Sequence, residues 1–451
     1  MEDRDVVQWL CEELSAGGAR DRDMGELEAL VDRRTLEIRR QVLQRLVQDE
    51  ADRTEFGCPV CGEKLSMVHR GRQRTVASTV GPVSFARDYG HCGRCESHAA
   101  PADAALGLHG RASASPRLQE ICALTVLHGP AGRAAEDVRR LAGVEVCAST
   151  LHREGFRQGE RALELRERDI RRAETPEGAA LLAAEARAAP RDATLIIEID
   201  AWNIRERDNW GLTEAVREAG GDTGRWHWVY TGTVFRLDQS GTTQSGRAVV
   251  TDRGYVATRA GIEAFERQMH VEALRRGLLQ AETVLVLGDG AVWIWNLAAR
   301  RFARASQRID LFHVKQHLWE LAASLHGKGT AEAQLWIRPY LCWLERRKNG
   351  ALDIIESLEQ LQLRTDADGA EAIARELGYF REHCGRMDYK AAKAEGQPCG
   401  SGAIESTCSQ YQRRFKLTGQ FWSLEGDEAF LALATLHRNG RWHQLFPHNL
   451  N

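Results

Sequence analysis

The stretch that decides the fold is TVLVLGDG at residues 283–290. Its first five residues are aliphatic or β-branched, a pattern that predicts a buried strand. Asp289 follows this strand and lies between two glycines, which let another backbone or a ligand come close. A second aliphatic run, TLIIEI at residues 194–199, leads directly into Asp200. The sequence therefore predicts two aspartates, each at the end of a buried strand.

A third carboxylate lies further along the chain, in the stretch GSGAIES at residues 400–406. Glu405 is near the start of a polar, helix-like segment over residues 404–415, and the preceding glycines leave room for a phosphate backbone. Magnesium prefers oxygen ligands, and in-line phosphodiester chemistry uses two cations about 3.5–4 Å apart. We expect Asp200, Asp289 and Glu405 to bind two Mg²⁺ or Mn²⁺ ions.

Each of these assignments has an alternative. Asp289 could be an ordinary turn residue, and Glu405 could stabilise the first turn of a helix, where the helix dipole favours acidic side chains. Glu198 lies two residues before Asp200, on the same strand face, and so competes with it for the metal role. We favour Asp200 because it lies at the end of the predicted strand.

Length and composition describe a multidomain globular chain. Its 451 residues are enough for about two to four domains. Hydrophobic residues make up 43% and charged residues 28%, proportions typical of globular proteins. No apolar run reaches transmembrane length, and the first residues do not form a secretory signal. We therefore expect an intracellular protein with no membrane partner.

Four of the eleven cysteines form a regular pattern, with Cys58 and Cys61 in one CxxC pair and Cys92 and Cys95 in another. Between the pairs, β-branched runs flank a Gly-Pro turn, which predicts a hairpin. Two such pairs joined by a hairpin indicate a zinc ribbon with tetrahedral coordination. The alternative is four unpaired buried cysteines. A disulfide framework is not expected, because the cysteine count is odd and no export signal is visible.

The residues before the core divide into three regions. Residues 1–55 have helical periodicity, residues 56–100 form the zinc ribbon, and residues 110–188 are helical again and end in a linker. In the third region, a helix over residues 134–142, a glycine-containing turn and a helix from Ser149 resemble a DNA-binding helix-turn-helix. An ordinary helical hairpin is the alternative.

From residue 190 onward, strands and helices alternate. The hydrophobic patterns predict strands at 194–200, 228–238, 248–258, 283–288 and 307–312, and helices at 261–279, 291–302 and 315–325. This is the order of a ribonuclease-H-like α/β core, in which the first and fourth strands lie side by side, so Asp200 and Asp289 would be neighbours. We expect this core to comprise residues 190–326 and 396–451, with residues 327–395 as a helical insertion. The expected fold class is therefore multidomain α+β.

Three strings resemble a known family: GDGAVWIWN at 288–296, GRMDY at 385–389 and GSGAIES at 400–406. They are similar to those of the DDE transposases of the ISKra family of insertion sequences, within the Mutator-like superfamily. The resemblance covers most of the chain. It implies a ribonuclease-H-like core, dependence on divalent metal and mobilisation of a DNA element by its terminal inverted repeats. It assigns Asp200, Asp289 and Glu405 to the catalytic metal triad.

A further string, DLFH at residues 310–313, resembles an Asp or Cys with a following His in the wider Mutator-like group. The resemblance implies that His313 contacts the scissile phosphate or steadies the catalytic site; the alternative is a hydrogen-bonded core histidine. Two features depart from the family pattern. Asp200 is followed by Ala201 and Trp202, where many relatives have Asp-Gly, and residues 205–224 form a longer, charged loop.

Contacts to DNA are expected mainly from the basic stretch after Glu405. Arg413, Arg414 and Lys416 could bind phosphates, which positions a duplex without reading its sequence, or could form a solvated helix face. Trp422 could stack on an unpaired base or could be a core residue. The tryptophans that we expect to serve only in packing are Trp202, Trp226, Trp228, Trp293 and Trp295. The net charge of −3 is not typical of a nucleic-acid-binding protein.

The function implied is a DNA transposase that cuts at terminal inverted repeats and joins the freed 3′-hydroxyl ends to target DNA. Its partners would be double-stranded DNA and further copies of the chain, at least as a dimer, and its location the cytoplasm, in association with the nucleoid. Two alternatives remain: a domesticated, non-catalytic DNA-binding regulator, and a structure-selective DNA nuclease.

Overall fold

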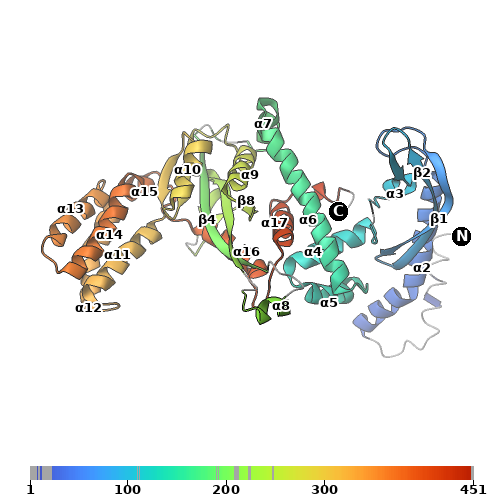
Figure 1. Cartoon of the computed structure of the whole chain (residues 1–451), viewed down its shortest axis with the longest axis horizontal. Helices are drawn as coiled ribbons and strands as arrows, with labels where there is room; N and C mark the ends of the chain where they lie inside the picture. Colours follow the sequence, from blue (N-terminus) through green and yellow to red (C-terminus); the bar gives the residue numbers. More distant parts are fainter. Residues whose placement is uncertain are drawn as a thin grey trace. The chain divides into compact units, whose positions relative to one another are not determined.

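The computed structural model describes residues 23–108, 112–188, 192–207, 213–221, 225–245 and 248–447, together with a few isolated residues. The chain divides into two compact units: Met1–Gly155 with Phe446–Asn451, and Phe156–Leu445. Helices and strands occur in both units, so the protein is of mixed α+β class (Figure 1). None of the described helices has the length and apolar character needed to span a membrane.

The first unit contains an antiparallel sheet in the order β1-β2-β3. β1 (Ser66–Ser78) and β2 (Gly81–Cys92) form the hairpin predicted from the sequence, and β3 (Ser97–Ala99) pairs with the end of β2. α2 (Met24–Arg53) packs against β2, and the Gln48 amide bonds both backbone groups of one β2 residue. This contact satisfies an otherwise unpaired strand edge. The expected helical residues before α2 lie largely outside the described part of the chain.

Helices complete the first unit: α3 (Pro101–Ala105), α4 (Pro116–His128), α5 (Ala131–Ala142) and the start of α6 (Ala148–Ala173). α5 ends at Gly143, whose φ of 65° is left-handed and therefore suits glycine. Buried side chains from α4, α5 and α6 share one core, including Leu118, Val138 and Leu151. The helix, glycine turn and helix expected in this region are present.

The second unit contains a five-stranded sheet in the order β10-β9-β4-β5-β8. Its strands are β4 (Thr194–Glu206), β5 (Arg225–Arg236), β8 (Gly254–Thr258), β9 (Thr283–Gly288) and β10 (Ser306–Ile309). β4, β5 and β8 are antiparallel, whereas β9 and β10 run parallel to β4. The strands that lead into Asp200 and Asp289 therefore lie side by side, as the element order predicts.

Three strand predictions need correction. The segment 307–312 is a strand only as far as Ile309, because Asp310 caps the next helix, α11 (Leu311–His326). The segment 248–258 is not one strand: β7 (Ala248–Val250) pairs with β6 (Ser240–Thr242) in a separate hairpin, and only β8 joins the main sheet. Asp200 is not the last residue of its strand, because β4 continues to Glu206 in its antiparallel pairing with β5. Its parallel pairing with β9 ends earlier, at Glu198. Asp200 is therefore at the end of the parallel ladder rather than of the strand.

Helices cover both faces of this sheet. α9 (Ile262–Arg275) and α10 (Val292–Arg301) share a core with Leu195, Ile197 and Ile199 of β4. Because side chains alternate along a strand, Ile196 faces the opposite side, which α16 (Gly402–Phe415) covers. α17 (Leu424–Arg438) packs against β8.

Further helices fill the sequence between β10 and α16: α11 (Leu311–His326), α12 (Ala331–Arg346), α13 (Gly350–Gln362), α14 (Ala367–His383) and α15 (Tyr389–Ala394). In Figure 1 they form the orange group beside the sheet of the second unit. Their buried side chains, such as Ile337 and Phe380, belong to the same apolar cluster as the sheet. The segment 327–395, which was predicted to be helical, contains helices along its length. In the sequence it lies between β10, the last strand of the sheet, and α16. Short helices also occur at Pro176–Ala183 (α7) and Thr213–Glu218 (α8).

Candidate active site and four-cysteine cluster

Asp200, Asp289 and Asp310 lie on or just after three neighbouring strands, and each follows the last residue of a parallel pairing. The parallel register of β4 and β9 ends with Glu198 paired with Leu287, and Asp200 and Asp289 each follow two residues later. The β9–β10 register likewise ends just before Asp310, whose N–H donates to the Gly288 carbonyl at 2.9 Å. The carboxyl ends of the parallel strands thus bring these acidic side chains to one edge of the sheet.

Glu405 reaches this edge because two acidic side chains hold the start of its helix. The Glu198 carboxylate accepts a hydrogen bond of 2.8 Å from the N–H of Ile404. Asp310 caps α11 by accepting from the N–H of Phe312 and His313, and its other oxygen accepts from the N–H and hydroxyl of Ser401. The first turn of α16 is therefore fixed to both β4 and α11.

The residues at this edge surround one cavity of about 210 Å³. Its wall contains the three expected ligands Asp200, Asp289 and Glu405, together with Ile199, Asp310, Phe312, His313, Gln316 and Ser401. The carboxylates assigned by resemblance thus line a common pocket, although they lie far apart in the sequence.

Electrostatic repulsion makes this pocket receptive to cations. Burial raises the pKa of Asp200, and the negative charge of Asp289 raises it further. Burial, Asp310 and Asp200 likewise raise the pKa of Glu405. Asp200 also accepts a hydrogen bond from the Cys408 thiol at 3.5 Å. Carboxylates that repel one another in a partly dry pocket are stabilised by a divalent cation, so the donor chemistry fits magnesium.

The carboxylate oxygens do not, however, converge on a single point. Within the described part of the chain, the four cysteines are the one group of three or more candidate ligands whose ligand atoms all lie within 4.8 Å of one another. The pocket is therefore more open than a closed one-ion site.

Glu198 and Asp200 point to the same face of β4, but their surroundings differ. Glu198 is 1% exposed and does not line the pocket. Burial raises its pKa to about 8, although the N–H of Ile404 opposes this shift. Glu198 therefore acts as an anchor for α16, and Asp200 is the better candidate ligand.

His313 and Asp310 have different positions in the pocket. His313 is half-buried on the pocket wall rather than sealed in a core. Asp310 is 3% exposed and accepts four hydrogen bonds through its two oxygens, so it serves as a clasp between helices. Sequence reasoning gave Asp310 no role, and it missed Ser401 and Phe312. The string DLFH contains Asp310 and Phe312, so the sequence did point to the place of these two residues, but it gave no sign of Ser401.

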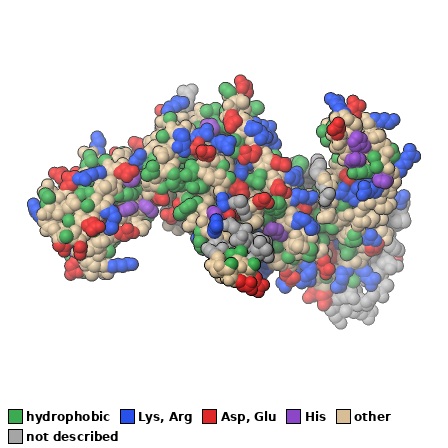
Figure 2. Space-filling model, in the orientation of Figure 1, with side chains coloured by type: hydrophobic (Ala, Val, Ile, Leu, Met, Phe, Trp, Pro, Cys, Tyr) green, Lys and Arg blue, Asp and Glu red, His purple; other side chains and the backbone are tan. Residues whose placement is uncertain are grey.

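The expected DNA-contact residues are distributed over surface and core. Arg413 and Lys416 are exposed, whereas Arg414 is half-buried, and burial lowers its pKa to about 10. Trp422 is 5% exposed, and its ring centroid lies 5.1 Å from the Arg414 guanidinium carbon. Trp422 is therefore in the core, which was the alternative to base stacking. Figure 2 shows basic and acidic side chains interspersed over the visible face.

Two of the tryptophans expected to pack are in fact on the surface. Trp226 and Trp228 are each 55% exposed on β5, whereas Trp202 and Trp295 are buried and Trp293 is partly buried. The Lys416 ammonium lies 5.3 Å from the Trp226 ring. The period of a strand does not reveal which of its faces is covered, so the sequence could not identify this exposure.

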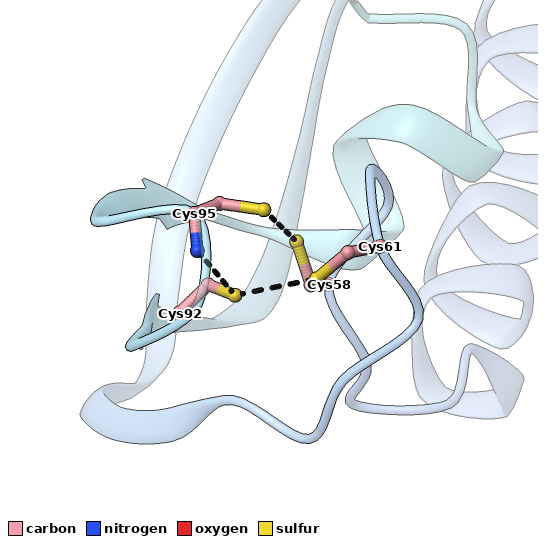
Figure 3. A group of neighbouring side chains, drawn as sticks. All are labelled: Cys58, Cys61, Cys92 and Cys95. Carbon is pink, nitrogen blue, oxygen red and sulfur yellow. Dashed lines mark hydrogen bonds between the residues drawn. The ribbon is translucent and has the colours of Figure 1, made fainter.

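The four cysteines of the ribbon form a compact cluster. Their thiols point toward one another from the loop before β1, from the end of β2 and from the turn that follows β2 (Figure 3). The Sγ atoms of Cys61 and Cys92 are 3.5 Å apart, and those of Cys58 and Cys95 are 4.0 Å apart. A tetrahedral zinc with bonds of about 2.3 Å requires sulfur atoms roughly 3.8 Å apart. Backbone N–H groups of Cys61 and Val60 lower the pKa of Cys58 to about 7, which favours a thiolate ligand. The cluster is therefore compatible with zinc.

Comparisons with known proteins leave the chain without a demonstrated family. No protein-family model matches it, and no curated protein does either. Among solved structures, a Drosophila P element transposase strand transfer complex is similar over 75% of this chain and 82% of that chain. The sequence identity is 12% and the TM-score is 0.24. A similarity of this size carries no argument about function, so the interpretation of the site rests on its own geometry.

Proposed function

We propose that the protein is a DDE-type DNA transposase, which cuts DNA at the terminal inverted repeats of an insertion sequence and joins the 3′-hydroxyl ends to target DNA. The observation that carries this proposal is the common pocket of Asp200, Asp289 and Glu405. The sheet adds support, since its first three core strands are antiparallel and the fourth and fifth run parallel to the first. That order is expected of a ribonuclease-H-like core.

Within this proposal the three carboxylates hold two magnesium ions. Magnesium, when bound there, would supply the charge that activates the attacking oxygen and stabilises the leaving oxygen. Asp200 and Glu405 have raised pKa values, so any proton that they carry is released as the cation binds. His313, on the pocket wall, would donate to a phosphate oxygen, while Asp310 would keep Glu405 in position through Ser401.

The remaining parts would bring DNA to this pocket. We assign zinc to Cys58, Cys61, Cys92 and Cys95, and recognition of the terminal repeats to the ribbon and the helices α4–α6. The exposed Arg413, on α16, and Lys416, just after it, would contact DNA phosphates. Joining of two element ends would require at least a dimer.

The test is a magnesium-dependent reaction on DNA that carries the sequences flanking the gene. Wild type should yield cleaved and then joined products. Asp289→Asn should lower the cleavage rate by at least about a hundredfold, the scale for loss of one charge-stabilising group, with DNA binding unchanged. Asp368→Asn is the matched control, because Asp368 is an exposed residue of α14 outside the pocket.

The other outcomes would each contradict the proposal in a different way. Cleavage retained by Asp289→Asn contradicts the assigned site. Cleavage without joined products favours a structure-selective nuclease. Tight binding without cleavage by either protein favours a DNA-binding regulator.

A further inference from the structure

An exposed phenyl ring lies on the wall of the carboxylate pocket. Phe312 is 67% exposed, although it lines a cavity whose other walls are mostly carboxylates and polar groups. Burial stabilises large apolar side chains, and the exposed Phe312 ring lacks most of this stabilisation. Its position at a reaction pocket distinguishes it from a scattered surface residue.

The structure fixes where this ring stands. Phe312 belongs to the first turn of α11, and its N–H donates to the Asp310 carboxylate at 2.6 Å. A Cβ added at Gly400 would come within 3.2 Å of the Phe312 ring, so glycine makes room for it there. Phe312 is therefore held between the clasp residue Asp310 and the turn that leads to Glu405.

The surroundings of the ring suit a nucleic acid. The Lys315 ammonium lies 5.7 Å from the ring centroid, although it also pairs with Glu345. The ring thus offers an apolar face next to a cation, beside the carboxylates that would hold the metal ions. DNA presents the matching chemistry, with flat base faces attached to an anionic backbone.

We propose that Phe312 stacks on an unpaired DNA base next to the scissile phosphate. This inference rests on the proposed function. A base that leaves its stack in a duplex loses the free energy of stacking. Stacking of that base on an aromatic side chain offsets the loss. Phe312 would therefore stabilise the opened DNA end in the orientation that presents its phosphate to Asp200, Asp289 and Glu405.

The experiment crosses a protein change with a DNA change. Phe312→Ala should lower kcat/KM for cleavage about tenfold or more on intact DNA, and Phe312→Trp should restore most of it. On DNA with an abasic site at the nucleotide beside the cleavage point, wild type should slow by a similar factor. On that abasic substrate Phe312→Ala should cleave no more slowly than wild type, because the missing base has already removed the stacking contact.

A neighbouring aromatic provides the matched control. Trp319 is 41% exposed on α11, seven residues and thus about two helical turns after Phe312. Trp319→Ala should leave both substrates unaffected. A fluorescent base analogue at the same nucleotide, measured in non-cleaving Asp289→Asn, should report stacking that disappears when Phe312→Ala is added.

Three results would overturn the inference, and they are distinguishable. If wild type cleaves DNA and Phe312→Ala cleaves equally well, the stacking role is wrong but the transposase proposal stands. If the two changes slow cleavage multiplicatively, Phe312 acts on something other than that base. If wild type cuts no DNA, the proposed function fails and the stacking role fails with it.

Discussion

At the scale of single residues, acidic side chains in the second unit have three different roles. Asp200, Asp289 and Glu405 face a cavity. Glu198 and Asp310 are buried and accept hydrogen bonds that hold α16 and α11. Asp427 is fully buried in α17 beside Glu206, away from the pocket. The sequence alone could not separate these roles, because each depends on the partner that the fold supplies.

Asp427 gives a pH prediction that is independent of the catalytic site. Burial, and next its contact with Glu206, raise its pKa from 3.8 to about 9, while Glu206 pairs with Arg259. Between these pH values the folded chain binds a proton that the unfolded chain has released. Stability should therefore fall as the pH rises through this window, by at most about 1.4 kcal/mol per pH unit.

The neutral variant Asp427→Asn should flatten this dependence and be at least as stable as wild type at pH 8. Denaturant unfolding at pH 5 and pH 8 measures the change, with Asp192→Asn, an exposed aspartate, as the control. A slope identical to that of wild type would show that Asp427 carries no such proton.

At the scale of elements, the aliphatic runs predicted most of the strands of the sheet but not their bounds. The run before Asp289 is β9, and the strand predicted at 228–238 overlaps β5, which spans Arg225–Arg236. The extension of β4 to Glu206 could not be predicted, because it depends on pairing with β5. The break before β8 was also missed; it lies where Asp252 pairs with Arg276 instead of continuing a ladder.

The prediction for the first unit concerns the zinc ribbon. Wild type should contain one zinc per chain, and Cys92→Ser should remove it, because Cys92 is fully buried in the cluster. Structural zinc contributes about 10–16 kcal/mol of apparent binding energy in zinc-finger peptides, so the variant ribbon should unfold. Elemental analysis and proteolysis measure both effects. Cys342→Ser, on an exposed cysteine of α12, should keep its zinc; equal zinc in both variants would refute the site.

At the scale of the whole molecule, the fold brings together residues that are far apart in the sequence. Asp200 and Asp289 are 89 residues apart, and Glu405 lies 116 residues beyond Asp289, yet all three line one pocket. The sequence predicted Asp200 and Asp289 as ligands from their place after aliphatic runs, and the resemblance pointed to all three carboxylates. It could not identify the clasp at Asp310 or the ring of Phe312, because both depend on the approach of α16 to α11.

The most direct test of this account is the binding of Mn²⁺, measured by calorimetry on the full chain with zinc in place. Wild type should bind Mn²⁺, and each of Asp200→Asn, Asp289→Asn and Glu405→Gln should weaken that binding at least about tenfold, while Asp368→Asn should not. Equal Mn²⁺ affinity in wild type and the three pocket variants would contradict the claim that these carboxylates form one metal site.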